Sequence, residues 1–297
     1  MPSYPFMQVD AFTSQPLHGN PCAVLLDTDD LDDRSMLAIA REMNLSETAF
    51  VRSSTVADFG VRYFTPAEEI PLAGHPTIAT TFALVEWGRL NLTADHTVIS
   101  LELKIGPIQV EIFSQEGQVQ SIFMTQVKPL FLAEYSAAQI APLFGLGVAD
   151  FLPGVPIQTV STGTPQLMLP LRNLDALRGA RLDVPGYANL RIRSDFFSPH
   201  LFCLQGITPE ARTFARHFGV PPDLPEDPFT GSATGGMAAY LWRYHLIDLP
   251  KFTAQQGHWM NRPGEAQVEI IGPREDIQAV KVGGQAVAVL RGELKIE

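Results

Sequence analysis

Apolar residues along the chain follow two different spacings. Between residues 32 and 43 they recur at helical spacing, which predicts an amphipathic helix with Asp32 as its N-cap. A second short helix is predicted over 137–144, ended by Gly145. Short apolar runs bounded by Gly, Pro and Asn predict strands at 6–12, 22–26, 48–52, 61–65, 157–160, 166–169, 266–271, 279–282 and 286–290, and strands dominate from 98 to 126.

Two further helical segments, 77–87 and 234–246, are apolar on nearly every face. A helix of this kind is buried inside a protein. Each follows a glycine-containing turn, and in these two turns Pro, Gly and Thr coincide at one constant offset. The turns are Pro71-Leu-Ala-Gly74-His75-Pro-Thr77 and Pro228-Phe-Thr-Gly231-Ser232-Ala-Thr234.

The two halves of the chain resemble each other beyond these turns. Arg62-Tyr-Phe64-Thr-Pro66 matches Arg212-Thr-Phe214-Ala-Arg216, and Gly19-Asn20-Pro21 loosely matches Gly163-Thr164-Pro165. We therefore predict a duplicated α/β (α+β) domain, in which each copy is a sheet rolled around one buried helix. The copies cover 1–127 and 128–297, with the last strand, about 286–297, free to pack with the N-terminal copy. The repeat favours a strand over 212–215, although apolar residues from 211 to 218 also have helical spacing.

Composition and charge exclude several classes of function. The chain has 297 residues, 45% of them hydrophobic, so each half can bury a core. The 32 acidic residues outnumber the 21 Lys and Arg, and the formal net charge of −11 disfavours nucleic-acid and membrane-surface binding. Two distant cysteines, Cys22 and Cys203, predict no disulfide framework. Because signal-peptide and membrane-span patterns are also missing, we expect a soluble cytoplasmic protein.

The paired glycine turns are the main functional signal. Each lies where a strand leads into a buried helix, and a helix N-terminus presents free N–H groups and a partial positive charge. Gly74, together with Gly231 and Ser232, therefore forms a candidate binding site for a carboxylate or phosphate. Glycines that only permit a tight turn are the alternative, and the duplication favours binding.

Three titratable residues accompany these turns. Glu47 stands between an amphipathic helix and an apolar strand, where burial would raise its pKa into the range suited to general acid–base catalysis. Asp227 directly precedes the second turn, as a second acid/base or as a group that orients a histidine. His75 follows Gly74, and we expect the helix N-terminus to lower its pKa and to favour a neutral ring. A surface or structural role is the alternative for each residue.

Other chemistries have weaker support in the sequence. The histidines show no spacing typical of a metal site, and no GxGxxG or GxxxxGK[ST] motif occurs. Ser232, His75 and Asp227 could supply a hydrolase triad, but the nucleophile-elbow motif is missing around Ser232. We therefore expect no metal site.

Further motifs follow one another in order over essentially the whole chain. They are Val9-Asp-Ala-Phe12, Gly19-Asn-Pro21, Ala40-Arg-Glu-Met-Asn-Leu-Ser-Glu47-Thr, Phe64-Thr-Pro66, Ala73-Gly-His-Pro76, Glu226-Asp-Pro-Phe-Thr-Gly-Ser-Ala233, and Gln256-Gly257 followed by Arg262-Pro263. In these residues the chain resembles the PhzF family, which comprises the phenazine-biosynthesis isomerase and its relatives. The resemblance is highly specific for family and fold and weakly specific for substrate.

This resemblance implies a diaminopimelate-epimerase-like fold with the active site between two similar domains. It also implies movement of a proton between carbons without metal or organic cofactor, as in the isomerisation of trans-2,3-dihydro-3-hydroxyanthranilate by the phenazine enzyme. The motifs carry the family's catalytic glutamate to Glu47, its aspartate to Asp227, and its substrate-contacting groups to Gly74, His75, Gly231 and Ser232. Diaminopimelate epimerase itself uses two cysteines at the two turns, and neither cysteine of this chain lies there.

From the sequence we thus predict an isomerase or epimerase-like enzyme for a small carboxylated molecule, with a homodimer as the family expectation. A small-metabolite binding protein with a vestigial site is the alternative. The segment 221–224 and Arg216, where the family usually has proline, depart from the phenazine enzyme and predict a different substrate. Arg216 is either a ligand for a second acidic group of that substrate or a surface residue.

Overall fold

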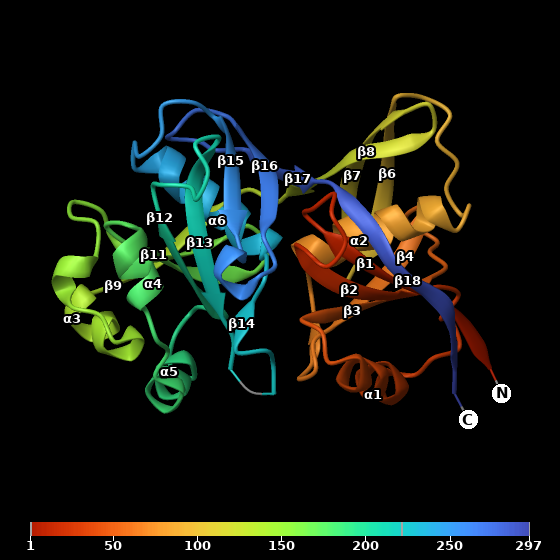
Figure 1. The fold of residues 1–297 in the computed structure, drawn as a ribbon, viewed down its shortest axis with the longest axis horizontal. Helices are drawn as coiled ribbons and strands as arrows, with labels where there is room; N and C mark the ends of the chain where they lie inside the picture. The colour runs from red at the N-terminus through yellow and green to blue at the C-terminus, as the bar shows by residue number, and fades with distance from the viewer. Residues whose placement is uncertain (1, 221, 297) are drawn as a thin grey trace.

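The computed structural model describes residues 2–220 and 222–296, which form two lobes side by side (Figure 1). The lobe coloured red to yellow, apart from its dark blue C-terminal strand, contains the helices α1 (Asp33–Met43) and α2 (Gly74–Glu86). Its strands are β1 (Ser3–Ala11), β2 (Asn20–Leu25), β3 (Glu47–Arg52), β4 (Phe59–Phe64), β5 (Glu69–Ile70), β6 (His96–Leu103), β7 (Gly106–Gln115), β8 (Gln118–Gln126) and the C-terminal β18 (Ala286–Lys295).

The second lobe is coloured green to blue in Figure 1. Its helices are α3 (Ala137–Ile140), α4 (Leu174–Gly179), α5 (Val184–Arg191) and α6 (Gly231–Arg243), with 3₁₀ turns at Ala141–Phe144, Val148–Asp150 and His258–Met260. Its strands are β9 (Leu130–Tyr135), β10 (Ile157–Ser161), β11 (Pro165–Pro170), β12 (Ser198–Cys203), β13 (Ala211–Phe218), β14 (Glu226–Asp227), β15 (Lys251–Gln256), β16 (Gly264–Ile271) and β17 (Ala279–Gly284).

Strand pairing joins the two lobes. β8 of the first lobe pairs antiparallel with β17 of the second, and β18, which follows β17 in the chain, returns to the first lobe and pairs antiparallel with β1. The chain therefore begins and ends in the first lobe, where the two termini lie close together (Figure 1). In the described residues no helix is long and apolar enough to cross a membrane.

Each lobe curves its sheet around one central helix. α2 packs against β1, β2 and β8, while α6 packs against β16, β17 and β11. Both helices are buried along most of their length, as their all-round apolar sequence predicts. The mixed α+β architecture, with one internal helix in each lobe, agrees with the prediction.

Both central helices begin three residues earlier than the hydrophobic pattern predicts. α2 starts at Gly74 rather than at residue 77, and α6 spans Gly231–Arg243 rather than 234–246. The first turn of each helix carries glycine, histidine, proline or serine, which add nothing to an apolar periodicity. The two glycine turns are therefore the first turns of the helices themselves.

Smaller features settle the remaining predictions of secondary structure. Asp32 is the N-cap of α1, since its side chain accepts a hydrogen bond from Ser35 N at 2.7 Å. The disputed segment 211–218 is the strand β13, as the repeat predicted. The predicted helix over 137–144 is α-helical only to Ile140 and then tightens into a 3₁₀ turn, which ends at Gly145 with φ 63°.

Candidate active site

A cavity of about 410 Å³ opens between the two lobes. The first lobe lines it with the start of β3 and with the segment from β5 into α2. The second lobe lines it with the starts of β11, β12 and α6 and with the ends of β13 and β14. The cavity brings together all six residues that the sequence predicted for the site: Glu47, Gly74, His75, Asp227, Gly231 and Ser232.

The starts of α2 and α6 meet at this cavity. A Cβ atom placed on Gly74 would lie 2.6 Å from the Cα of Gly231 and 2.7 Å from the backbone nitrogen of Ser232. A Cβ on Gly231 would lie 2.9 Å from the ring of Phe12 and 3.1 Å from the Cα of Gly74. Glycine is required at both positions because the two helices approach so closely, and no left-handed backbone is involved.

Among the described residues, neither helix start has a side chain that caps it or offsets its positive charge. The N-cap residues, Ala73 for α2 and Thr230 for α6, make no side-chain cap hydrogen bond within the described chain, and neither first turn contains an acidic residue. The first N–H groups of a helix have no intrahelical acceptor, so at a buried end they need a partner. Two positive helix ends that face one cavity suit an anion such as a carboxylate.

Glu47 is the first residue of β3 and lies beside Cys22 of β2 in the parallel register. Its Oε2 atom is buried and has no hydrogen-bond partner among residues 2–220 and 222–296. Burial raises the pKa of Glu47 well above its ordinary value, and the charges of Asp227 and Asp223 raise it further. A carboxyl group of this kind can both remove and return a proton near neutral pH.

His75 is the second residue of α2 and is fully buried. Its Nδ1 lies 3.0 Å from Asn20 Nδ2, so Nδ1 accepts a hydrogen bond and Nε2 carries the ring proton. Burial lowers the pKa of His75 to about 4, and the charge of Asp227 opposes this effect. The pKa is low, as predicted, but the main cause is burial rather than the helix N-terminus.

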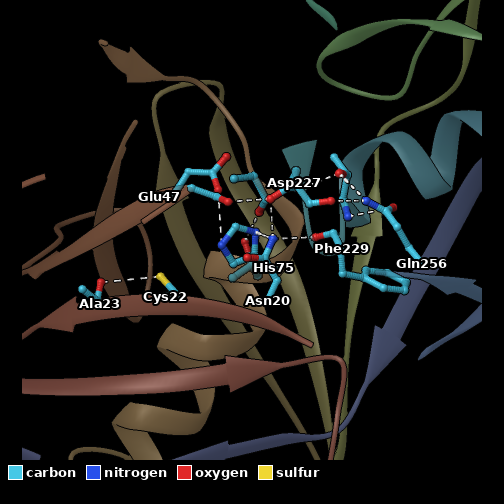
Figure 2. A network of polar contacts seen from close by, with 12 residues as sticks. Asn20, Cys22, Ala23, Glu47, His75, Asp227, Phe229 and Gln256 are labelled. Atoms are coloured by element: carbon cyan, nitrogen blue, oxygen red, sulfur yellow. Dashed lines mark hydrogen bonds and ion pairs between the residues drawn. The ribbon is translucent and has the colours of Figure 1, made fainter. Parts of the chain in front are cut away.

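Glu47 and His75 point toward each other in the cavity (Figure 2). Glu47 Oε2 and His75 Nε2 lie 3.2 Å apart, yet they are not aligned for a hydrogen bond, and neither atom has another partner in the described residues. Buried polar atoms are rarely left unpaired in folded proteins. This pair of atoms is therefore available to a third group that enters the cavity.

Asp227 is held by donors from both lobes (Figure 2). Its Oδ1 accepts hydrogen bonds from Asn20 Nδ2 at 2.8 Å and from Ser46 Oγ at 2.6 Å, and its Oδ2 accepts one from Thr230 Oγ1. Its backbone carbonyl accepts a hydrogen bond from Gln256 Nε2 at 2.7 Å. These hydrogen bonds hold the Asp227 side chain in place between the two lobes, where its charge acts on Glu47.

Glu47, His75 and Asp227 also place one potential metal-ligand atom each within 4.8 Å of one another. Imidazole and carboxylate groups are common metal ligands. The oxygens of Asp227, however, already accept hydrogens from hydroxyl and amide groups, and a shell of donors complements an anion. The donor set therefore fits acid–base chemistry better than a metal centre.

Several residues that line the cavity, or that contact the residues lining it, were not predicted from the sequence. Asn20 contacts both His75 and Asp227, and its place in the Gly19-Asn20-Pro21 repeat is the one signal that could have revealed it. Gln166, Ser198 and His217 come from three neighbouring strands and belong to no motif. They were missed because only the pairing of these strands places them side by side.

Arg216 has neither of the two roles considered for it. Its guanidinium forms a bidentate ion pair with Glu226, with both N–O distances at 2.8 Å, and donates to the carbonyl of Ala180 at 2.9 Å. The side chain is only 12% exposed and does not line the cavity, so both the substrate-ligand and the surface interpretation are wrong. From the segment 221–224, Asp223 and Leu224 line the cavity, whereas Pro221 lies outside the described residues.

Comparison with solved structures defines the class of this fold. A phenazine biosynthesis protein of the PhzF family from Bacillus anthracis matches with a TM-score of 0.86 and 32% identity, and the match covers 100% of both chains. A hydroxyproline epimerase from Agrobacterium vitis matches with a TM-score of 0.69 and 12% identity, over 98% of this chain and 92% of that one, which bears on the fold alone. These matches confirm the predicted epimerase-like fold.

Sequence comparison gives the family. A family model described as phenazine biosynthesis-like protein matches residues 9–292. The chain is also 33% identical over 293 residues to the trans-2,3-dihydro-3-hydroxyanthranilate isomerase of Pseudomonas fluorescens, which covers 97% of this chain and 98% of that enzyme. The chain belongs to the phenazine biosynthesis-like family, PhzF, as the motifs indicated.

Proposed function

We propose that this protein is an isomerase that moves a proton between two carbon atoms of a small carboxylated substrate. One observation carries the proposal: a carboxyl group with one buried oxygen and a raised pKa, Glu47, shares a cavity with two uncapped helix starts. The Pseudomonas fluorescens relative named as an isomerase supports the reaction class. The substrate is a separate question, because cavity walls vary within a family while acid–base groups persist.

In this proposal the helix starts bind the substrate carboxylate. Gly74, His75, Gly231 and Ser232 line the cavity at the two positive helix ends, so their backbone N–H groups serve as donors to the carboxylate, and the Ser232 hydroxyl adds another. Such binding places the carbon next to the carboxylate in reach of Glu47. It also stabilises the negative charge that develops on the carboxylate oxygens when that carbon loses its proton.

Glu47 then acts twice in one turnover. Ionised Glu47 takes a proton from one carbon and, now protonated, returns a proton to another carbon of the same molecule, so that the reaction is balanced without an oxidant or reductant. Between the two transfers the acidic proton of Glu47 can exchange with solvent. The neutral His75 ring offers its Nε2–H to a developing oxyanion, and Asp227 holds Asn20 and Ser46 in place. Asp227 also keeps the pKa of Glu47 high by charge repulsion.

Solvent-deuterium incorporation tests this function. The purified protein is incubated in D₂O with a panel of small carboxylates, and each compound is analysed by mass spectrometry and NMR. An isomerase that uses Glu47 exchanges deuterium into at least one compound at carbon. A pure binding protein would bind a compound and leave it unlabelled, and that outcome would overturn the proposal.

Three further features belong to the same proposal. We place the boundary between two domains at 127/128, with β18 as part of the N-terminal domain because it pairs with β1. We propose a homodimer, which sedimentation velocity tests. We propose a cytoplasmic location, which suits two buried free thiols and which cell fractionation tests.

A further inference from the structure

A chain of four polar side chains crosses three adjacent strands of the second lobe. Gln166 lies on β11, Ser198 and His200 on β12, and His217 on β13, and these strands are neighbours in the sheet (Figure 1). The four residues are between 0% and 6% exposed. His200 Nδ1 lies 3.3 Å from His217 Nδ1, His217 Nε2 lies 2.8 Å from Ser198 Oγ, and Ser198 Oγ lies 2.6 Å from Gln166 Oε1.

The distances indicate which atom donates and which accepts in each hydrogen bond of this side-chain network. A separation of 2.6 Å is ordinary for an O–H···O bond and short for an N–H···O bond, so the Ser198 hydroxyl donates to the carbonyl oxygen of Gln166. Ser198 has only one hydrogen and must therefore accept from His217 Nε2–H. His217 Nδ1 in turn accepts from His200 Nδ1–H, which requires the His217 ring to be neutral. Burial lowers the pKa of His217 to about 4 and that of His200 well below its ordinary value.

The direction of this chain determines how the Gln166 carboxamide is turned. Because Oε1 is occupied by Ser198, the two N–H bonds of Nε2 face away from that hydroxyl. No residue of the described chain accepts a hydrogen bond from Nε2, although Gln166 is 2% exposed and lines the cavity. Asp195, on the same wall, differs in that its carboxylate accepts from Ala133, Tyr135 and Thr159 and is saturated.

We propose that Gln166 is a substrate-binding residue, that its Nε2 hydrogens bind a second oxygen acceptor of the substrate, and that Ser198, His217 and His200 position it. This rests on the proposed function, in which the first carboxylate occupies the helix starts. The substrate class is thereby narrowed to carboxylates that carry a second carboxylate or carbonyl oxygen. His200 and His217 are positioning residues, because they act on the substrate only through Gln166.

The test is a comparison of two sets of probes on the purified protein. Succinate, glutarate and adipate each carry two carboxylates at increasing separation, and butyrate, valerate and hexanoate are monocarboxylates of comparable length. Isothermal titration calorimetry measures the affinity of each probe at pH 7. We expect at least one dicarboxylate to bind the wild-type protein about 10-fold more tightly than the matched monocarboxylate, as for one hydrogen bond to a charged group.

Substitutions of Gln166 test whether its side chain causes the preference for dicarboxylates. Gln166→Met should remove the preference for the dicarboxylate and leave the monocarboxylate affinity unchanged. Gln166→Glu keeps the shape of the side chain and the bond to Ser198 but turns an oxygen toward the ligand, so it should weaken dicarboxylate binding below the level of Gln166→Met. Gln158→Met is the matched control, because Gln158 is a buried glutamine on β10 that bonds Leu132 and Tyr244 and does not line the cavity.

Ser198 variants test the positioning chain. Ser198→Ala should reduce the dicarboxylate preference without altering monocarboxylate binding, and Ser198→Thr, which restores a hydroxyl, should recover it. Equal dicarboxylate affinity in the wild type and in both Gln166 variants would overturn the proposal for Gln166 while the anion site at the helix starts stands. If no probe of either set binds the wild-type protein, the anion site and the role of Gln166 both fail.

Discussion

Asn20 Nδ2 donates a hydrogen bond to Asp227 Oδ1 over 2.8 Å, although the two residues are 207 positions apart in the chain. The same amide group lies 2.8 Å from the carbonyl of Phe229 and 3.0 Å from His75 Nδ1. One fully buried side chain thus connects the first lobe to β14 and sets the tautomer of the cavity histidine. The relative position of the two lobes and the protonation of the site are therefore coupled at Asn20.

Replacement of Glu47 by glutamine should abolish proton transfer and preserve the fold. The amide has the size of the carboxyl group but cannot take a proton, and loss of a general acid–base typically costs about 10²–10⁴-fold in rate. The measurement is the rate of solvent-deuterium incorporation into the compound that the wild-type protein labels. Circular dichroism and the binding of that compound serve as controls, and a variant that retains wild-type exchange would remove Glu47 from the mechanism.

Replacement of Gly74 by alanine should separate the two helix starts. The added methyl group would stand 2.6 Å from the Cα of Gly231, and overpacking of this kind costs about 1–3 kcal/mol. We expect lower thermal stability and loss of anion binding, measured as the protection by sulfate against thermal unfolding. Gly179→Ala is the control, because no atom lies within 4 Å of a Cβ at that position.

Sulfate should occupy the same helix starts in crystals. A crystal grown with sulfate is expected to show the ion within hydrogen-bond distance of the backbone N–H groups of Gly74 and Ser232, for the reason that both helix ends are positive and uncapped. The Gly74→Ala protein crystallised in the same way should lack it. Sulfate bound only elsewhere in the wild type would contradict the assignment of the anion site.

Protonation of His75 should destabilise the fold in acid. The pKa is about 4 in the folded protein and 6.5 in the unfolded chain, so the unfolded state binds the proton first and stability falls as pH drops from 6.5 to 4. The difference of about 2.5 pKa units corresponds to roughly 3 kcal/mol at the acid end of this window.

The measurement for His75 is urea denaturation of the wild type and of His75→Gln at pH 7 and pH 4. Glutamine does not titrate, so the advantage of the wild type over the variant should shrink at pH 4. Glu47 has a raised pKa and acts in the opposite sense, since its contribution is lost as pH rises from about 4.5, and it is common to both proteins. A difference in stability that is equal at both pH values would show that His75 does not titrate with a lowered pKa.

Alkylation of thiols should leave the activity intact. Cys22 and Cys203 are buried, and burial raises the pKa of Cys22 well above its ordinary value and that of Cys203 to about 11. Neither is a thiolate at neutral pH, so iodoacetamide should modify the native protein slowly and should not reduce deuterium exchange. The protein unfolded in guanidinium should react at both cysteines, as mass spectrometry would show; rapid inactivation of the native protein would point instead to thiol chemistry.

The protein should turn over trans-2,3-dihydro-3-hydroxyanthranilate poorly or not at all. Asp223 and Leu224, in the segment that we predicted to differ from the phenazine enzyme, form part of the cavity wall, and a displacement of about 1 Å in a bound substrate can cost 10²-fold in rate. The loss of the absorbance of that compound measures the reaction, with the Pseudomonas fluorescens enzyme as the positive control. Turnover in the ordinary enzymatic range, roughly 1–10³ per second, would instead identify trans-2,3-dihydro-3-hydroxyanthranilate as a substrate of this protein.

The amino-acid sequence by itself was enough to predict the two buried helices, the rolled sheets and the six residues that share the cavity. The spacing of apolar residues within one segment predicts whether a helix is buried. Gly, Asp and Ser at a strand-to-helix turn mark a helix start with free N–H groups. For this reason the two helix starts could be predicted without coordinates, whereas the roles expected for Glu47, His75 and Asp227 also depended on the resemblance to the PhzF family. The repeat correctly favoured a strand at β13.

The tertiary structure decided what depends on residues far apart in the chain. Only the packing of α2 against α6 shows that Gly74 and Gly231 touch, and only the pairing of β11, β12 and β13 brings Gln166 and His217 into one chain of hydrogen bonds. Arg216 is a second example, because its ion pair with Glu226 depends on the pairing of β13 with β14. Distances and hydrogen bonds between remote side chains follow from strand register and helix packing, which no local pattern of residues encodes.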